Sequence, residues 1–352
     1  MASHLLKKGW IWGMLIAIGM VIAIVGSTAL SSLSAATTTT KFPYTVKDLG
    51  TLGGKDSYAN AINNVGKVVG QSETNSGDTH AVLWNKGKKI DLGIIGGNYS
   101  TATDINNAGK VVGSDYINYG QPHAILWDKG NKIALGTLGG KKSYAYGINN
   151  VGKVVGQSET NSGDTHAVLW NKGKKIDLGT LGGNYSNAFG INNVGKVVGN
   201  STTSSGAYHA VLWVKGNKID LGTLGGRISG AYGINNAGQV VGYSSTSSDA
   251  THAVLWDKGK IIDLGSLGSN DTYAYSINNA GKIVGFSKTT KGSRALLWDI
   301  WDKNSIKDLN SLIPPKSGLL LEYARSINDK GQIVGWGTIN GQTRAFLLTP
   351  VK

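Results

Sequence analysis

The stretch from Gly136 to Gly183 reads GTLGGKKSYAYGINNVGKVVGQSETNSGDTHAVLWNKGKKIDLGTLGG, and it begins and ends on the same five letters. Its phrase INNxGxxVG returns along the chain, with the Ile at positions 62, 105, 148, 191, 234, 277 and 327. The first five intervals are 43 residues and the last is 50, so the chain contains seven repeats. A repeat of this length predicts similar units that pack side by side.

Each repeat holds four short segments of strand character, separated by turn residues. In the first repeat these are Tyr58–Asn63, Lys67–Ser72, His80–Trp84 and Lys88–Leu92. Glycine in the links NNVG and NKG supplies the positive φ that a tight hairpin requires. Four antiparallel strands in roughly 40 to 45 residues are typical of one blade of a β-propeller.

The two ends of the repeat region favour a closed ring over an open β-solenoid. The region begins with a fourth strand at Tyr44–Gly50 and ends with a third strand at Arg344–Pro350. A propeller uses such an offset to complete its last blade with the N-terminal strand. The sequence therefore predicts an all-β, seven-bladed β-propeller of four-stranded antiparallel blades over residues 44–350, with the last blade closed by the N-terminal strand.

The repeated motifs are similar to those of a known family. HAVLW, INNxGxVVG, the DLGTLGG links and the ending DLNSLIPPKSG…INDKGQIVGWG…RAFLLTP resemble the HAF repeat family of probable extracellular repeat proteins, from Tyr44 to Pro350. The resemblance implies an exported repeat protein and supplies no catalytic or binding residues. The sixth and seventh repeats depart from the name motif, because Arg294 and Arg344 replace its His.

The N-terminal residues have the pattern of an export signal. Two lysines precede the uncharged run Gly9–Gly26, which is followed by small and polar residues. This pattern predicts a signal peptide or an N-terminal membrane anchor over residues 1–36, with a short linker at 37–43. Cleavage after Ala29 or Ala36 would release an extracellular protein, whereas retention would hold the propeller at the cell surface.

The composition narrows the classes of function. The chain has 352 residues, no cysteine and a formal net charge of +14, from 35 Lys and Arg against 21 Asp and Glu. The positive charge favours anionic partners, and the lack of cysteine excludes disulfides, thiolate metal sites and thiol catalysis. The sequence contains no phosphate loop, dinucleotide fingerprint or nucleophile elbow. We therefore expect neither a cofactor nor a metal.

A polar side chain at the start of the third strand faces the end of the fourth strand across a hairpin. Its recurrence favours a buried bracing hydrogen bond over a catalytic or metal-binding dyad, because catalysis needs one site and bracing needs one in each blade. The second repeat has Ala134 in place of the acid. The predicted bracing residues are His80, His123, His166, His209, His252, Arg294 and Arg344, with Asp91, Asp177, Asp220, Asp263, Asp308 and Asp48.

The first strand of each repeat lines the channel of a propeller, and here the repeats differ. Two residues before each Ile stand Asn60, Thr103, Tyr146, Phe189, Tyr232, Tyr275 and Arg325. Aromatic rings at a channel mouth stack on sugars or peptides, but they also fill space between blades, and both interpretations stay open. The candidate ligand-binding residues are Tyr146, Phe189, Tyr232, Tyr275 and Arg325.

Lysines gather at the links between the first and second strands and between the third and fourth strands. An antiparallel blade places both kinds of link on one face. Lysine at exposed strand edges also serves solubility, so an anionic partner is one of two interpretations. The candidate anionic-polymer face comprises Lys67, Lys88, Lys110, Lys153, Lys174, Lys196 and Lys260.

These features predict an exported, non-enzymatic binding or scaffold protein at the cell surface or outside the cell. Its expected partner is an anionic surface polymer, a glycan or a protein. Nucleic acid is not expected as a partner of an exported chain, and the membrane is expected to matter only through an uncleaved N-terminal segment. Two alternatives stay open: a carbohydrate-active hydrolase or lyase with Asp56, Asp104 or Glu322 at the channel mouth, and a structural surface-layer component.

Overall fold

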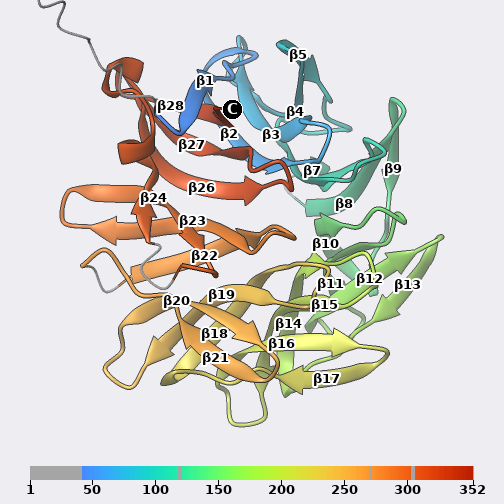
Figure 1. Cartoon of the computed structure of the whole chain (residues 1–352). Helices are drawn as coiled ribbons and strands as arrows, with labels where there is room; N and C mark the ends of the chain where they lie inside the picture. Colours follow the sequence, from blue (N-terminus) through green and yellow to red (C-terminus); the bar gives the residue numbers. More distant parts are fainter. Residues whose placement is uncertain (1–41, 118–120, 269–270, 303–305, 352) are drawn as a thin grey trace, which may run out of the picture. The chain divides into compact units, whose positions relative to one another are not determined.

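The first repeat shows how the sequence folds locally (Figure 1). Its strands are β2 (Gly53–Ile62), β3 (Val68–Thr74), β4 (Thr79–Asn85) and β5 (Lys88–Asp91), paired antiparallel in that order. The middle strands are buried, and all four residues of β5 are exposed. Each such set of four strands is called a group and numbered by its repeat.

The computed structural model describes residues 42–351, apart from 118–120, 269–270 and 303–305. The chain divides into two units, 1–41 and 42–352. The predicted signal or anchor at 1–36 and most of the linker at 37–43 lie outside the described residues. Within the described ranges, none of the helical segments could span a bilayer.

Groups 2 to 7 repeat the same order of strands. Group 2 contains β6 (Ser100–Ile105), β7 (Val111–Ile117), β8 (Gln121–Asp128) and β9 (Asn131–Ala134), and group 3 contains β10 (Gly139–Ile148), β11 (Val154–Thr160), β12 (Thr165–Asn171) and β13 (Lys174–Asp177). Group 4 contains β14 (Gly182–Ile191), β15 (Val197–Thr203), β16 (Tyr208–Val214) and β17 (Asn217–Asp220), and group 5 contains β18 (Gly225–Ile234), β19 (Val240–Thr246), β20 (Thr251–Asp257) and β21 (Lys260–Asp263). Group 6 contains β22 (Asp271–Ile277), β23 (Lys282–Thr289), β24 (Gly292–Asp299) and β25 (Lys307–Asp308), and group 7 contains β26 (Leu320–Ile327), β27 (Ile333–Ile339), β28 (Gln342–Pro350) and β1 (Tyr44–Asp48).

The four-stranded group is the structural unit even where strands of neighbouring groups pair with each other. Groups 3 to 6 share one 16-stranded sheet. Neighbouring groups within it are joined by a single parallel residue pair each, such as Thr165 with Tyr185. The antiparallel ladders within each group are much longer, so the joints add little to the pairing.

The first strands begin earlier than the sequence predicts, at Gly53 rather than Tyr58 in β2. The register of β2 on β3 shifts between Gly53 and Ser57. Side chains of β3 supply acceptors there, because Leu52 N donates to Ser72 Oγ at 2.8 Å and Lys55 N donates to Glu73 Oε2 at 2.6 Å. These side-chain bonds extend the strand into the glycine-rich link.

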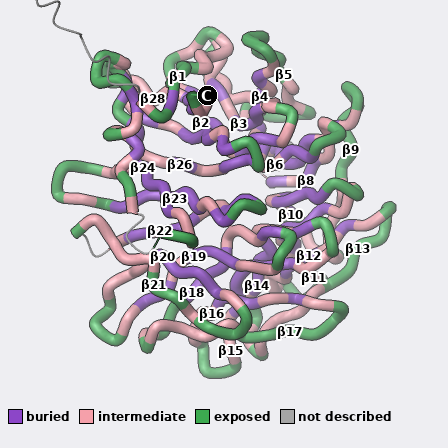
Figure 2. Tube along the Cα trace, in the orientation of Figure 1, coloured by how far each residue is buried: buried purple, intermediate pink, exposed green. Residues whose placement is uncertain are grey.

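The hydrophobic core is divided among the contacts between neighbouring groups. Val69 and Ala81 of group 1 pack with Ile105 and Trp127 of group 2, and the same pattern recurs in the later groups. Figure 2 shows buried residues along the middle strands and exposed residues at the outer hairpins. Stability in such a chain is approximately a sum of terms between neighbours.

The two ends of the described chain lie side by side. Strand β1 pairs antiparallel with β28, from Tyr44 with Pro350 to Asp48 with Phe346, and Val351 N donates to Pro43 O at 2.9 Å. In Figure 1 they are the blue and red strands next to each other. This pairing supplies group 7 with its fourth strand.

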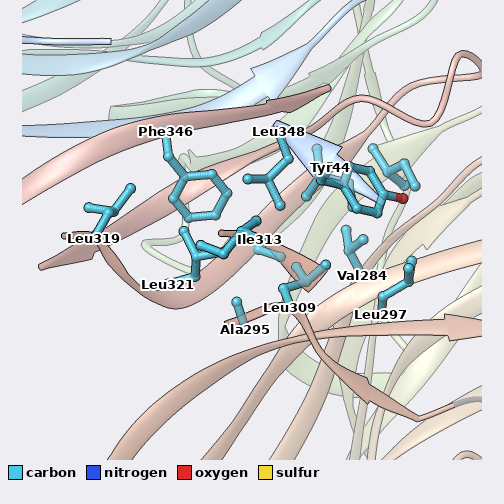
Figure 3. Packing of buried hydrophobic residues seen from close by; sticks show 13 residues of the cluster. Tyr44, Val284, Ala295, Leu297, Leu309, Ile313, Leu319, Leu321, Phe346 and Leu348 are labelled. Atoms are coloured by element: carbon cyan, nitrogen blue, oxygen red, sulfur yellow. The ribbon is translucent and has the colours of Figure 1, made fainter. Parts of the chain in front are cut away.

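The insertion that lengthens the last interval packs into the core at this junction. It forms two short 3₁₀ helices, η1 (Leu309–Leu312) and η2 (Pro315–Ser317). Leu309 and Ile313 join Tyr44, Phe346 and Leu348 in one buried cluster (Figure 3). The insertion therefore stabilises the contact between the two ends of the chain.

A series of asparagines links the inner strands of all the groups. In each repeat, the first Asn after the Ile donates from Nδ2 to the backbone oxygen of its counterpart in the next repeat, and the last one donates back to the first. The series runs through Asn63, Asn106, Asn149, Asn192, Asn235, Asn278 and Asn328. Four-stranded antiparallel groups whose inner strands are linked in this way make an all-β fold of the β-propeller type.

Candidate functional site

The inner strands surround a central channel that differs at its two ends. At one end, a cavity of about 170 Å³ is lined in every repeat by the Ile and the two polar residues that follow it. Next to it lies a cavity of about 380 Å³ that shares Ile191, Ile234 and Ile277 with the first. All five candidate ligand-binding residues line this larger cavity.

One side of the larger cavity is an arc of aromatic rings. Ring centroids are 5.2 Å apart for Tyr146 and Phe189, 5.3 Å for Phe189 and Tyr232, and 5.2 Å for Tyr232 and Tyr275. The arc ends at Arg325, whose guanidinium carbon lies 4.0 Å from the centroid of the Tyr275 ring. The rings pack on one another and also line the cavity, so packing is one of their roles, and ligand binding stays a prediction.

The other side of the same cavity is polar. Asn60 Nδ2 donates to Ala102 O at 2.9 Å, and Thr103 Oγ1 donates to Ala145 O at 2.8 Å. Asp104 accepts from Ile148 N and from Ile105 N, each at 2.8 Å. Burial raises the pKa of Asp104 to about 7, and the two backbone N–H groups oppose that rise. One wall of the cavity therefore consists of neutral polar side chains and the titrating carboxyl of Asp104, and the opposite wall consists of aromatic rings.

The three acids considered for an enzyme do not meet in this cavity. Asp104 lines it, whereas Asp56 accepts from Thr343 N at 2.8 Å and Glu322 accepts from Thr338 Oγ1 at 2.8 Å. Neither Asp56 nor Glu322 is among the residues that line the cavity. Over the described ranges, no three His, Asp or Glu side chains lie together as a metal ion would need.

The structure pairs the predicted bracing residues, but at the surface rather than in the core. The His Nδ1 to Asp Oδ2 distances are 2.7–2.8 Å in groups 1, 3, 4 and 5. The imidazoles are 17–25% exposed and the carboxylates 41–44% exposed, because the fourth strand is the open edge of each group. The four pairs are His80 with Asp91, His166 with Asp177, His209 with Asp220, and His252 with Asp263.

The same carboxylates also hold the turn that follows the fourth strand. Asp91 Oδ1 accepts from Gly93 N at 2.6 Å, and Asp177, Asp220 and Asp263 repeat this bond. This double use of each Asp is a structural role. His123 lies opposite Asp115 on the neighbouring strand. The arginine contacts are longer, at 3.9 Å for Arg294 with Asp308 and 3.7 Å for Arg344 with Asp48.

The strand register gathers the lysines on one side of the molecule. Val68 pairs with Trp84, and Trp84 pairs with Lys89, so the β2–β3 and β4–β5 links lie at the same end of the group. We call the side that carries the links between first and second strands and between third and fourth strands the lysine face; in group 1 these links are residues 63–67 and 86–87. The opposite side carries the links between second and third strands and the links from one group to the next, and we call it the tyrosine face. Among the predicted lysines, Lys67, Lys110, Lys153 and Lys196 are half-buried, and Lys88, Lys174 and Lys260 are exposed.

Few carboxylates neutralise the lysine face. Ion pairs on this face, within the part of the chain that the structure describes, include Lys110 with Asp128 at 2.7 Å and Lys282 with Asp299 at 3.1 Å. A cleft of about 690 Å³ between groups 7 and 1 is lined by Lys47, Lys86 and Lys330, together with apolar side chains. The face therefore presents ammonium groups with little local compensation.

The links between the third and fourth strands hold lysine in an unusual backbone conformation. Five lysines there have φ between 49° and 51°, in the left-handed region where Gly, Asn or Asp is favoured. Asn340 has the same conformation, with φ of 50°, in the link between β27 and β28, the second and third strands of group 7. From the sequence alone, these lysines are recognised only as charges. They are Lys86, Lys129, Lys172, Lys215 and Lys258.

Comparison with known proteins shows a shared fold. No family model matches the sequence, and no curated protein matches it. The chain is similar to puromycin hydrolase, at 12% identity and a TM-score of 0.54, over 83% of this chain and 51% of that one. It is also similar to a Mycobacterium tuberculosis puromycin-hydrolyzing peptidase, at 11% identity and a TM-score of 0.51, over 88% and 52%.

A third similar structure is the WD40 beta propeller domain of Doa1, at 12% identity and a TM-score of 0.47, over 87% of this chain and 97% of that one. The chain spans about half the length of the two puromycin-cleaving proteins. Identities this low concern the fold alone and carry no catalytic residue to this chain.

Proposed function

We propose that the chain is an exported, non-enzymatic, closed seven-bladed β-propeller that docks on an anionic polymer through its lysine face. Closure is supported by the pairing of β1 with β28 and by the asparagine series that returns to Asn63. Export is supported by the N-terminal pattern and by the resemblance to the HAF repeat family.

The observation that carries the proposal is the set of lysines with positive φ. A non-glycine residue in the left-handed region costs roughly 1–2 kcal/mol. A lysine placed only for solubility gains nothing from this position, because any exposed site serves as well. The strain is explained if these turns must project positive charge outward from the lysine face.

The chemistry of the face suits weak binding at many points. Ammonium groups are compact, strongly hydrated charges that attract anions without fixed geometry, unlike the guanidinium fork of arginine. Many such contacts add up along a polymer. Each contact weakens as salt shortens the Debye length, which is roughly 10 Å at 0.1 M. An acidic polysaccharide or another polyanion at the cell surface fits this behaviour.

The proposal is tested on a heparin column eluted with a sodium chloride gradient. One variant carries Lys88→Glu, Lys174→Glu and Lys260→Glu on the lysine face. The matched control carries Lys55→Glu, Lys141→Glu and Lys142→Glu, three exposed lysines of the tyrosine face. Both variants change the net charge equally. We expect the first to elute at much lower salt and the control close to the parent; equal shifts for both would refute docking by the lysine face.

A further inference from the structure

A second variable position lies on the second strand of each repeat. It faces the residue four places before the Ile on the first strand, as Tyr243 faces Gly230 and Phe286 faces Tyr273. This position becomes aromatic in the last three repeats. Its occupants are Gln71, Ser114, Gln157, Asn200, Tyr243, Phe286 and Trp336.

These rings extend the aromatic arc of the channel toward the tyrosine face. Ring centroids are 5.5 Å apart for Tyr232 and Tyr243, and 5.1 Å apart for Tyr243 and Tyr273. A Cβ at Gly230 would lie 2.6 Å from the ring of Tyr243. The absence of a side chain at Gly230 therefore gives the Tyr243 ring its place beside the first strand.

A groove of about 550 Å³ follows this row of rings. Its lining shares Tyr232 with the channel cavity of about 380 Å³, so the two spaces adjoin. Exposed Arg227 and Asp249 line the groove together with Thr251, whereas the Ser245 hydroxyl is bonded to the backbone of Ile228. Burial raises the pKa of Tyr243 and that of Tyr273, so both phenols stay neutral at physiological pH.

The lining points to the chemistry of the occupant. Flat phenol rings offer stacking surfaces, and the phenol hydroxyls, Arg227 and Asp249 offer hydrogen bonds at their edges. The groove is lined by one arginine and one carboxylate, Arg227 and Asp249, and the channel cavity by Arg325 and the titrating Asp104, so neither space has a cluster of charges of one sign. This combination suits a chain of rings that has apolar faces, many hydroxyl groups and no net charge.

We propose that the channel cavity and the groove beside Tyr243 form one extended cleft that binds a neutral oligosaccharide. One end of the oligosaccharide enters the channel over Tyr232 and Tyr275, and the following sugar rings lie over Tyr243 and Tyr273. This site is on the tyrosine face and is independent of the docking proposed for the lysine face. Failure of either proposal leaves the other standing.

The test is calorimetric titration of the full chain with neutral hexasaccharides of glucose, N-acetylglucosamine, xylose and mannose. The first variant is Tyr243→Gln, because glutamine occupies the same position in groups 1 and 3. The second is Arg227→Asn, an exposed site where group 4 has Asn184. The control is Tyr208→Thr, a tyrosine of group 4 outside both cavities, which group 3 replaces by Thr165.

We expect at least one hexasaccharide to bind, with an affinity that hardly changes between 0.05 M and 0.5 M salt. Tyr243→Gln is expected to weaken that binding at least tenfold and Arg227→Asn at least threefold, while Tyr208→Thr leaves it unchanged. Insensitivity to salt separates this site from the lysine face. The proposal is overturned if none of the four sugars binds, if Tyr243→Gln and Arg227→Asn both bind like the parent, or if only peptides compete for the cleft.

Discussion

Asn328 Nδ2 donates a hydrogen bond of 3.0 Å to the backbone oxygen of Asn63, which lies 265 positions earlier in the chain. The same bond joins every other pair of neighbouring repeats, such as Asn149 to Asn192 at 3.1 Å. A bond between residues so distant in sequence forms only when the last group reaches the first. The asparagines therefore report on the contact between the last group and the first as well as on each local turn.

Replacement of Asn149 by Ala is expected to destabilise the fold clearly. The side chain is 2% exposed, donates to Asn192 O and accepts from Lys153 N. Loss of these bonds removes the acceptor of Lys153 N and leaves Asn192 O with the bond from Gly195 N, at a cost of about 1–3 kcal/mol. The measurement is the melting temperature by circular dichroism. Asn150→Ala, at an exposed residue that accepts one backbone bond, serves as control and should shift the melting temperature less.

Deletion of residues 44–48 is expected to lower the melting temperature by several degrees or more. The deletion removes β1 from β28 and takes Tyr44 out of the cluster with Phe346 and Leu348. Lys47→Ala, which changes an exposed residue of the same strand, should melt like the parent. An unchanged melting temperature for the deletion would contradict closure by the N-terminal strand.

Stability should fall as pH rises from about 4 to about 7, through the Asp104 carboxyl. Its pKa is about 7 in the folded chain and 3.8 as the ordinary value. The folded state thus holds this proton more tightly, so the contribution to stability is complete below the unfolded pKa and is lost as pH rises through the folded pKa. Comparison of melting temperatures at pH 5 and pH 8 checks this. Asp104→Asn should flatten the difference; an equal slope in both proteins would assign it to other groups.

The left-handed lysines between the third and fourth strands are expected to lower stability and to strengthen binding to polyanions. The triple variant Lys172→Asn, Lys215→Asn and Lys258→Asn replaces three left-handed lysines by a residue that tolerates this conformation, as Asn340 does in the link between β27 and β28. We expect about 0.4–1 kcal/mol of added stability at each site. The same variant should elute from heparin at lower salt than the parent. Greater stability with unchanged elution would show that these lysines serve no polyanion.

Most of the fold can be predicted from the sequence, because repetition makes each local signal appear several times. The offset between Tyr44–Gly50 and Arg344–Pro350 predicts which strands meet at the ends of the chain, and β1 does pair with β28. The early start of β2 could not be predicted, because it depends on Ser72 and Glu73 accepting bonds across a shifted register. The longer last interval predicts an insertion but not its packing, because only the structure shows that Leu309 and Ile313 are core residues.

The candidate site was predictable only where a single strand position varies. Variation two residues before each Ile identified the aromatic arc and Arg325. The groove could not be predicted, because it depends on the Tyr243 ring lying beside Gly230. That contact follows only from the register of β18 on β19. The surface position of His80 with Asp91 was missed because periodicity does not show which strand is the open edge.

The bond from Val351 N to Pro43 O has a practical consequence for measurement. Pro350 lines the cleft between groups 7 and 1 on the lysine face, so both ends of the described unit leave on that side. A capture tag that follows Val351 directly is therefore attached on the lysine-face side, which leaves the tyrosine face toward the flowing buffer. Sugar binding can therefore be followed on immobilised protein, whereas binding of polyanions is better measured with the protein free in solution.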